Sequence, residues 1–188
     1  MRIIVFLFYL SYALQGCSQQ KNSSQINNTS DSTSSIMFKK PSPGKLFVKA
    51  ENAYQEGYYK ETIELCNQII TLDSNYTEAF YLRGKTKYRL GNYRSSIKDF
   101  NIVIYRNPDY NDAYVSRGGG YQVLGEYQAA LKDFNHVINR NPNDRRPYYN
   151  RALIYELRNE MQKACADWRK AAKLGDDAAA AEVEKNCK

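Results

Sequence analysis

A period of 34 residues runs through most of this 188-residue chain. The tripeptides that mark it are Gly57-Tyr58-Tyr59, Gly91-Asn92-Tyr93 and Gly125-Glu126-Tyr127, and the next step reaches Asn159-Glu160-Met161. A fixed period of this length indicates a repeat architecture, in which each unit packs mainly on its neighbours. We therefore expect four units from residue 43 to residue 176, with the bounds 43–76, 77–110, 111–144 and 145–176.

Each unit contains two apolar segments whose side chains recur at steps of three and four residues, which is the period of an α-helix. The phase of these side chains is kept from unit to unit, as in Leu46, Phe80, Tyr114 and Tyr148. A glycine between the two segments permits a tight turn. Asn-Pro follows the second segment of the middle two units, at Asn107-Pro108 and Asn141-Pro142, and proline disfavours continuation of a helix. Every unit is therefore predicted to be a helix–turn–helix pair.

Small residues share one phase in the first helix of each unit, at Ala50, Gly84, Gly118 and Ala152. They are expected to let the two helices of a unit approach closely, opposite Thr62, Ser96, Ala130 and Ala164. Gly119 and Gly120 extend the third unit's glycine run, although each interior glycine costs up to about 1 kcal/mol relative to alanine. The pattern offers no reason for Gly120, and a hinge, a ligand close to the backbone and neutral drift stay open.

This combination of period, small residues, Gly-x-Tyr turn and proline resembles the tetratricopeptide repeat family. The aromatic phase of Phe100, Phe134 and Trp168 agrees as well, and the resemblance covers about three-quarters of the chain. It implies an all-α fold: a right-handed α-solenoid of four helix–turn–helix repeats. Gly175 is a helix stop and Asp176 or Asp177 a helix cap, so residues 177–188 are predicted to form a capping helix over the last unit.

The resemblance also implies a non-catalytic interaction scaffold that binds an extended peptide or a partner subunit in a concave groove. The family's inward positions correspond to Phe47, Glu51, Tyr54, Glu78, Tyr81, Lys85, Tyr88, Asp112, Val115, Gly119, Gln122, Arg146, Tyr149, Leu153 and Glu156. Tyrosines often anchor interfaces, although these could instead pack between units. Phe47 and Tyr81 stand where some members carry a lysine that grips a terminal carboxylate, so that specificity is not expected here.

Two charged phases run through the repeats: Arg83, Arg117 and Arg151, and, 16 residues after each, Asp99, Asp133 and Asp167. The regular spacing favours ion pairs between the two helices of a unit. A stripe of arginines that grips an anionic ligand is the alternative.

The cysteines divide into three groups. Cys66 shares the phase of Phe100 and is predicted to be a buried thiol. Cys165 and Cys187 lie about ten residues before and twelve after Gly175, so antiparallel helices would bring their sulfurs to similar heights. A disulfide or two free thiols are the alternatives for this pair. The fourth cysteine, Cys17, belongs to the N-terminal segment.

The N-terminus has the layout of a signal peptide: Met1-Arg2 precede an apolar run that ends at Leu14. The following Gln15-Gly16-Cys17 completes a segment that resembles the bacterial lipobox, which implies a signal peptide over residues 1–16 and lipidation of Cys17. Residues 17–42 are rich in Ser, Asn and Gln and are expected to be a disordered tether. Ser18 resembles signals for sorting to the outer membrane of the cell envelope; an ordinary cleaved signal is the alternative.

The formal charge of +7 favours anionic partners, but the basic residues are spread over the whole repeat region. Nucleic acid is not expected to be a partner of an exported chain. His136 is the only histidine and is expected to face outward, and no phosphate-binding loop is present, so we expect no enzyme, no cofactor and no metal site. Two further functions stay open: a structural subunit of a pilus or β-barrel assembly machine, and an accessory that binds an anionic cell-wall polymer.

Overall fold

The computed structural model describes residues 41–188, which contain nine α-helices and no strand. The first helices of the four pairs are α1 (Pro43–Gln55), α3 (Thr77–Arg89), α5 (Asn111–Val123) and α7 (Arg145–Leu157). Their partners are α2 (Tyr59–Leu72), α4 (Tyr93–Arg106), α6 (Tyr127–Arg140) and α8 (Met161–Lys173), and α9 (Asp177–Asn186) follows. The predicted all-α helical repeat fold is thereby confirmed. The signal peptide, Cys17 and nearly all of the expected tether lie outside the described residues.

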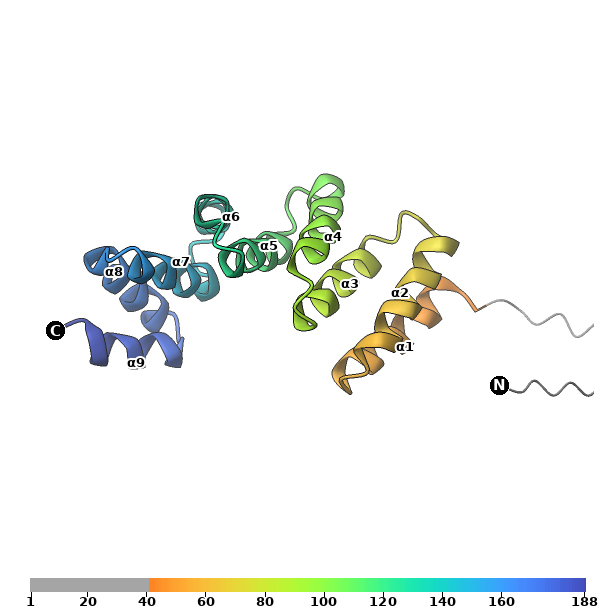
Figure 1. The fold of residues 1–188 in the computed structure, drawn as a ribbon, viewed down its shortest axis with the longest axis horizontal. Coiled ribbons are helices and arrows are strands. Elements are labelled where there is room, and N and C mark those ends of the chain that lie inside the picture. Colours follow the sequence, from red (N-terminus) through yellow and green to blue (C-terminus); the bar gives the residue numbers. More distant parts are fainter. Residues whose placement is uncertain (1–40) are drawn as a thin grey trace, which may run out of the picture. The chain divides into compact units, whose positions relative to one another are not determined.

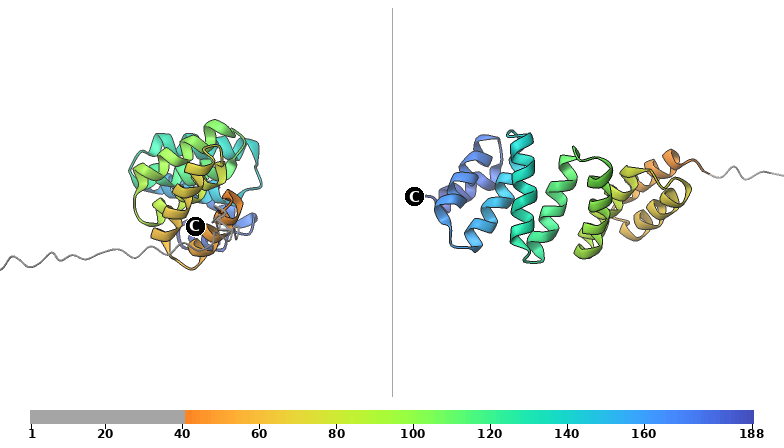
Figure 2. Two further views of the ribbon diagram at one scale, coloured as in Figure 1. Left: turned by 90° about the vertical axis from the view of Figure 1, so that its right-hand side faces the viewer. Right: turned by 90° about the horizontal axis from the view of Figure 1, so that it is seen from above.

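The helix pairs are stacked one after another from α1–α2 to α7–α8 (Figure 1; Figure 2, right). Each helix packs on its neighbours in the chain, and α1, α3, α5 and α7 also contact one another in sequence. The second helices pack chiefly on the first helices of their own and the following pair. The first helices therefore form the more tightly spaced layer, on the inner side of the array.

Two glycines in the first helices lie against aromatic rings of the second helices, which leave no space for a side chain. A Cβ atom on Gly84 would lie 2.7 Å from Phe100, and one on Gly118 would lie 2.6 Å from Phe134. The expected opposite residues Ser96 and Ala130 are buried, but the groups that fill the space over the glycines are the phenyl rings. The expected close approach of the two helices is therefore present, and the group nearest to each glycine is the ring one turn further along the second helix than the predicted opposite residue. Gly120 has a similar reason, since its Cβ would lie 3.1 Å from Ile97.

The turn inside each pair depends on a residue with positive φ. Gly57, Gly91 and Gly125 have φ values of 84°, 77° and 76°. In the fourth pair Asn159 occupies the same position with φ 58°. Asparagine tolerates the left-handed region better than most residues, so the turn persists where the glycine of the Gly-x-Tyr motif is missing.

A repeated ion pair joins the two helices of a pair and the pair before it; we call it the arginine clasp. Arg117 donates two hydrogen bonds to Asp133, at 2.8 and 2.7 Å, and a third to Asn101 of the preceding pair, at 2.7 Å. The same bonds link Arg83 to Asp99 and Asn67, and Arg151 to Asp167 and Asn135. The predicted ion pairs are confirmed, and the asparagines connect consecutive units as well.

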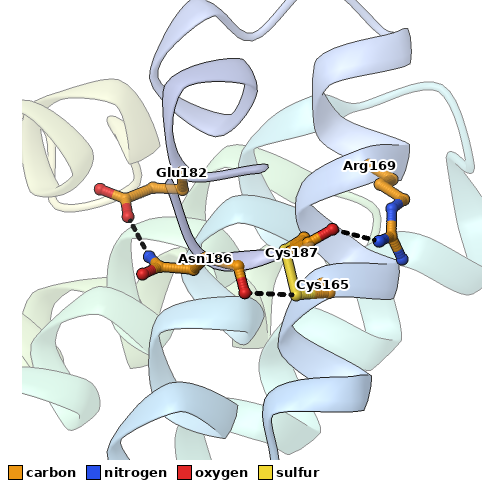
Figure 3. The surroundings of a disulfide bond; sticks show 5 residues. All are labelled: Cys165, Arg169, Glu182, Asn186 and Cys187. Carbon is orange, nitrogen blue, oxygen red and sulfur yellow. Dashed lines mark hydrogen bonds between the residues drawn. A yellow bond between two sulfur atoms is a disulfide. The ribbon is translucent and has the colours of Figure 1, made fainter. Parts of the chain in front are cut away.

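The last helix, α9, lies against α8 and is joined to it by a disulfide between Cys165 and Cys187 (Figure 3). Arg169 of α8 donates a 2.9 Å hydrogen bond to the carbonyl oxygen of Cys187. Asp176 is the N-cap residue and accepts a hydrogen bond from the Ala179 amide at 2.9 Å. Ala179 and Trp168 are both fully buried in the shared core, so α9 covers the end of the array. Cys66, by contrast, is a free and fully buried thiol, and burial raises its pKa to about 12.

Candidate functional site

A pocket of about 600 Å³ opens on the inner layer of the array. Its walls come from all four first helices, with Phe100 of α4 as a contribution from the outer layer. Of the predicted groove positions, seven line this pocket: Tyr54, Lys85, Tyr88, Val115, Gly119, Gln122 and Leu153. This volume is in the usual range for ligand sites in proteins.

Two tyrosines, one lysine and one arginine form the wall contributed by α1 and α3. The Lys85 Nζ atom lies 4.8 Å from the centre of the Tyr54 ring and 5.6 Å from that of Tyr81, within the range of cation–π attraction. Tyr88 packs edge-on against Tyr93 and is half-buried, and burial raises the pKa of its phenol. Arg89 contacts the Tyr54 hydroxyl, and this contact raises the pKa of the guanidinium. The wall is therefore aromatic and positively charged.

Three aromatic groove candidates pack between structural elements instead of lining the pocket. The Phe47 ring lies 5.3 Å from Tyr76, and the Tyr81 ring lies 4.9 Å from Tyr110 and 5.9 Å from Phe100. Burial raises the pKa of Tyr81 to about 12. Tyr149 packs on the core that α8 and α9 share. These three rings therefore pack between helices, which was the alternative to lining the groove.

The acidic groove candidates and Arg146 lie outside the pocket lining. Glu51 and Glu78 are exposed, and Glu156 is half-buried outside the pocket lining. Arg146 pairs with Asp112 at 2.6 Å and with Asp144 at 2.7 Å, and these bonds raise the pKa of its guanidinium. The carboxylate of Asp112 is thus already neutralised by a neighbouring unit.

Six lining residues were not among the groove positions predicted from the sequence: Arg89, Phe100, Ser116, Val123, Asn150 and Leu157. Most of them could have been found from the 34-residue period, because they recur at equivalent positions of the units. Arg89, Val123 and Leu157 end their helices at positions 34 residues apart, and Ser116 and Asn150 share a second phase. The family's inward positions omit the last residue of the first helix, which here borders the pocket.

A second depression, of about 700 Å³, lies over α5 and α6 and is lined by polar residues around Tyr114 and His136. The His136 ring stacks on Tyr114, with 4.0 Å between ring centres and 17° between the planes. The expectation that His136 faces outward was wrong, because the imidazole packs on an aromatic ring and is half-buried.

Residues 41–188 contain no group of three His, Cys, Asp or Glu side chains arranged to hold a metal ion. None of their helices is long and apolar enough to cross a membrane.

Comparisons with solved structures place this arrangement among known folds. MamA matches with a TM-score of 0.67 at 24% identity, covering 73% of this chain and 80% of that one. TTC0263, a thermophilic TPR protein in Thermus thermophilus, matches with a TM-score of 0.64 at 22% identity, covering 72% and 75%. YrrB, described as a TPR protein with an unusual peptide-binding site, matches with a TM-score of 0.68 at 18% identity, covering 76% and 74%. These identities support a shared fold.

Family models of the tetratricopeptide repeat match two stretches of the sequence, residues 78–110 and residues 120–181. The first stretch covers α3 from its second residue and all of α4, and the second extends from the end of α5 into α9. No curated protein sequence matches the chain. The matches to the repeat, the 34-residue spacing of the helix pairs and the similar solved structures agree, and the chain therefore contains tetratricopeptide repeats.

Proposed function

We propose that this protein is a non-catalytic interaction scaffold that holds an extended segment of a partner protein in its inner pocket. The observation that carries this proposal is a single pocket of about 600 Å³ lined by α1, α3, α5 and α7 together. A site that crosses four helices suits an elongated ligand better than a compact one. YrrB, which shares the fold, is described as having an unusual peptide-binding site.

The lining supports binding and offers little for chemistry. It combines tyrosines, aliphatic side chains and the amides of Gln122 and Asn150. Tyrosine provides a large contact area with little conformational entropy to lose, and is common at the centres of interfaces. Ser116 is the only lining residue with an aliphatic hydroxyl, and no histidine or carboxylate that could act as its base lines the pocket.

The proposal includes attachment to the outer membrane of a bacterial envelope through a lipid on Cys17. Its support is the sequence alone, in the segment Leu14-Gln15-Gly16-Cys17 and the Ser18 that follows. Two or three acyl chains anchor a protein stably where one chain binds only marginally. Mass spectrometry of the purified mature protein is the test: an acylated Cys17 at the N-terminus supports the anchor, and an unmodified N-terminus at any other residue contradicts it.

The arginines of the repeats give little support to a role in binding an anionic polymer. Arg83, Arg117 and Arg151 would form the basic stripe, but each is committed to an aspartate of its own unit. They are therefore not available as a row of free cations.

Site-specific crosslinking in the full-length protein tests the scaffold proposal. A photoreactive residue is placed at Gln122 or Leu157 in the pocket, and at Lys98 on α4 as a control. We expect the pocket positions to crosslink to one short segment of one protein, identified by mass spectrometry, and the Lys98 position not to do so. The same products from both surfaces, or products at Lys98 alone, would show that partners are held elsewhere.

A further inference from the structure

The inner pocket is divided into a cationic part and an apolar part. Lys85 and Arg89 lie one turn apart on α3, so they project from the same side of the helix. Leu153 and Leu157 are also one turn apart, on α7, and Val123 of α5 lies with them in the lining. No aspartate or glutamate lines the pocket.

The two cations have no carboxylate partner among residues 41–188. On the outward side of the same helix, Arg83 and Lys87 both pair with Asp99, at 2.7 and 2.8 Å. The Lys85 ammonium lies over the faces of Tyr54 and Tyr81, and Arg89 lies beside the Tyr54 hydroxyl. Aromatic rings attract a cation without neutralising it. An incoming carboxylate would therefore meet two unneutralised positive groups.

The apolar part is unusually exposed for residues of its type. Val123 is 52% exposed and Leu157 is 61% exposed, and each is the last residue of its helix. Most other aliphatic side chains of the first helices are buried or half-buried. Covering Leu157 with another apolar side chain would remove this surface from water, which is favourable.

We propose that the bound segment carries an acidic side chain that pairs with Lys85 and Arg89 and a large aliphatic side chain that covers Leu153 and Leu157. This inference rests on the proposed function and specifies the partner's chemistry. The pairing is charge-assisted and involves a guanidinium, whose planar donors match a carboxylate. The pocket volume of about 600 Å³ accommodates a few side chains.

Peptide binding to the full-length protein tests the inference. The probes are eight-residue peptides with blocked ends and an uncharged dye, in which one Glu and one Leu are separated by one to four Gly or Ser residues. Matched probes carry Lys in place of Glu. By fluorescence anisotropy we expect the best Glu peptide to bind at least about tenfold more tightly than its Lys counterpart, as a charge-assisted contact predicts.

A charge-reversal variant makes the test specific. Lys85→Glu combined with Arg89→Glu is expected to invert the preference, so that the Lys peptides bind more tightly. Lys60→Glu combined with Lys98→Glu, on α2 and α4, makes the same change in net charge at exposed sites outside the pocket and is expected to keep the Glu preference. Leu157→Ser should weaken both classes of peptide. Circular dichroism checks that each variant is folded.

The outcomes separate the two proposals. Equal binding of Glu and Lys peptides, or inversion of the preference by the Lys60 and Lys98 changes, overturns the acidic and aliphatic specificity. If Leu157→Ser still weakens binding in that case, the pocket remains the binding site and the scaffold proposal stands. If no peptide binds, the inferred specificity is wrong, and the scaffold proposal is decided by the crosslinks from Gln122 and Leu157.

Discussion

Neighbouring glycines in α5 meet very different surroundings. A Cβ on Gly118 would lie 2.6 Å from the Phe134 ring, which is fully buried, so the ring or the backbone would have to shift. A Cβ on Gly119 would meet nothing nearer than the Tyr88 hydroxyl, at 3.5 Å, which is an ordinary contact. The first glycine is thus required by packing, and the second is not.

We therefore expect opposite effects of the same substitution at these two positions. Gly118→Ala should lower the free energy of unfolding by about 1–3 kcal/mol, as overpacking does in other cores. Gly119→Ala should raise it by up to about 1 kcal/mol, because alanine loses less backbone entropy in a helix. Urea unfolding followed by circular dichroism measures both. Destabilisation of equal size at the two positions would show that the Phe134 contact is not the cause.

At the level of helix pairs, the arginine clasp fixes how one pair meets the next. The side chain of Asp133 is 4% exposed and that of Arg117 is 17% exposed, so both charges are largely removed from water. The clasp uses three helices, because Asn101 belongs to α4, Arg117 to α5 and Asp133 to α6.

Asp133→Ala should therefore lower the free energy of unfolding by about 3 kcal/mol, because it leaves a largely buried guanidinium without its counterion. Asp109→Ala is the matched control: this aspartate pairs with Arg140, but its side chain is 71% exposed, and the loss should be under about 1 kcal/mol. A double-mutant cycle with Arg117→Met isolates the coupling by urea unfolding. A coupling near zero would contradict the assigned role of the clasp.

The attachment of α9 depends on the disulfide between residues 165 and 187, which are 22 positions apart in the chain. In the chain-entropy view, closing a loop of this size stabilises the fold by about 3 kcal/mol. Replacing both cysteines by alanine should therefore lower the free energy of unfolding by about that amount. Trp168, the only tryptophan, lies in the same core and should shift its fluorescence to the red at lower urea than in the cystine-containing protein. Identical fluorescence transitions in the two proteins would argue against this role of the disulfide.

The period was sufficient to predict the helix pairs, because apolar spacing, turns and 34-residue phases all lie within a short stretch of sequence. It also predicted the Arg–Asp pairs, since their 16-residue spacing is constant. Contacts that depend on side-chain size across units were harder: Gly120 was unexplained because its partner Ile97 lies in the preceding unit. Only part of the pocket lining was predicted. Tyr54 and Lys85 follow the family pattern, whereas Leu157 is at the helix end, outside that pattern.

Across residues 41–188, the two ends of the array are finished in different ways. At the far end α9 covers the last pair, whereas the corresponding surface of α1 has no helix over it among the described residues. Lys45, Val48 and Asn52 of α1 correspond in phase to the buried residues Ala79, Leu82 and Thr86 of α3. All three α1 residues are exposed. The first pair therefore has one packed neighbour and no clasp of its own.

This difference should appear in hydrogen exchange of the native protein. Because stability in stacked repeats is roughly a sum of unit and interface contributions, we expect amides of α1 and α2 to exchange fastest among the helices of the four pairs. Amides of α4, α5 and α6, which have neighbours on both sides, should exchange most slowly. Mass spectrometry of peptic fragments makes this comparison, and uniform protection from α1 to α8 would indicate one cooperative unit instead.

Because the arginine clasp is repeated, the number of helix pairs can change independently of the residues that determine binding specificity. Asn67, Asn101 and Asn135 present the same amide to whichever arginine follows. Removing residues 111–144 would bring Arg151 to Asn101, and inserting a copy would create one more identical junction. Recombination can thus add or remove a helix pair without requiring new contacts at the junction between pairs. The residues of the inner pocket, which differ from unit to unit, are then free to diverge for each partner.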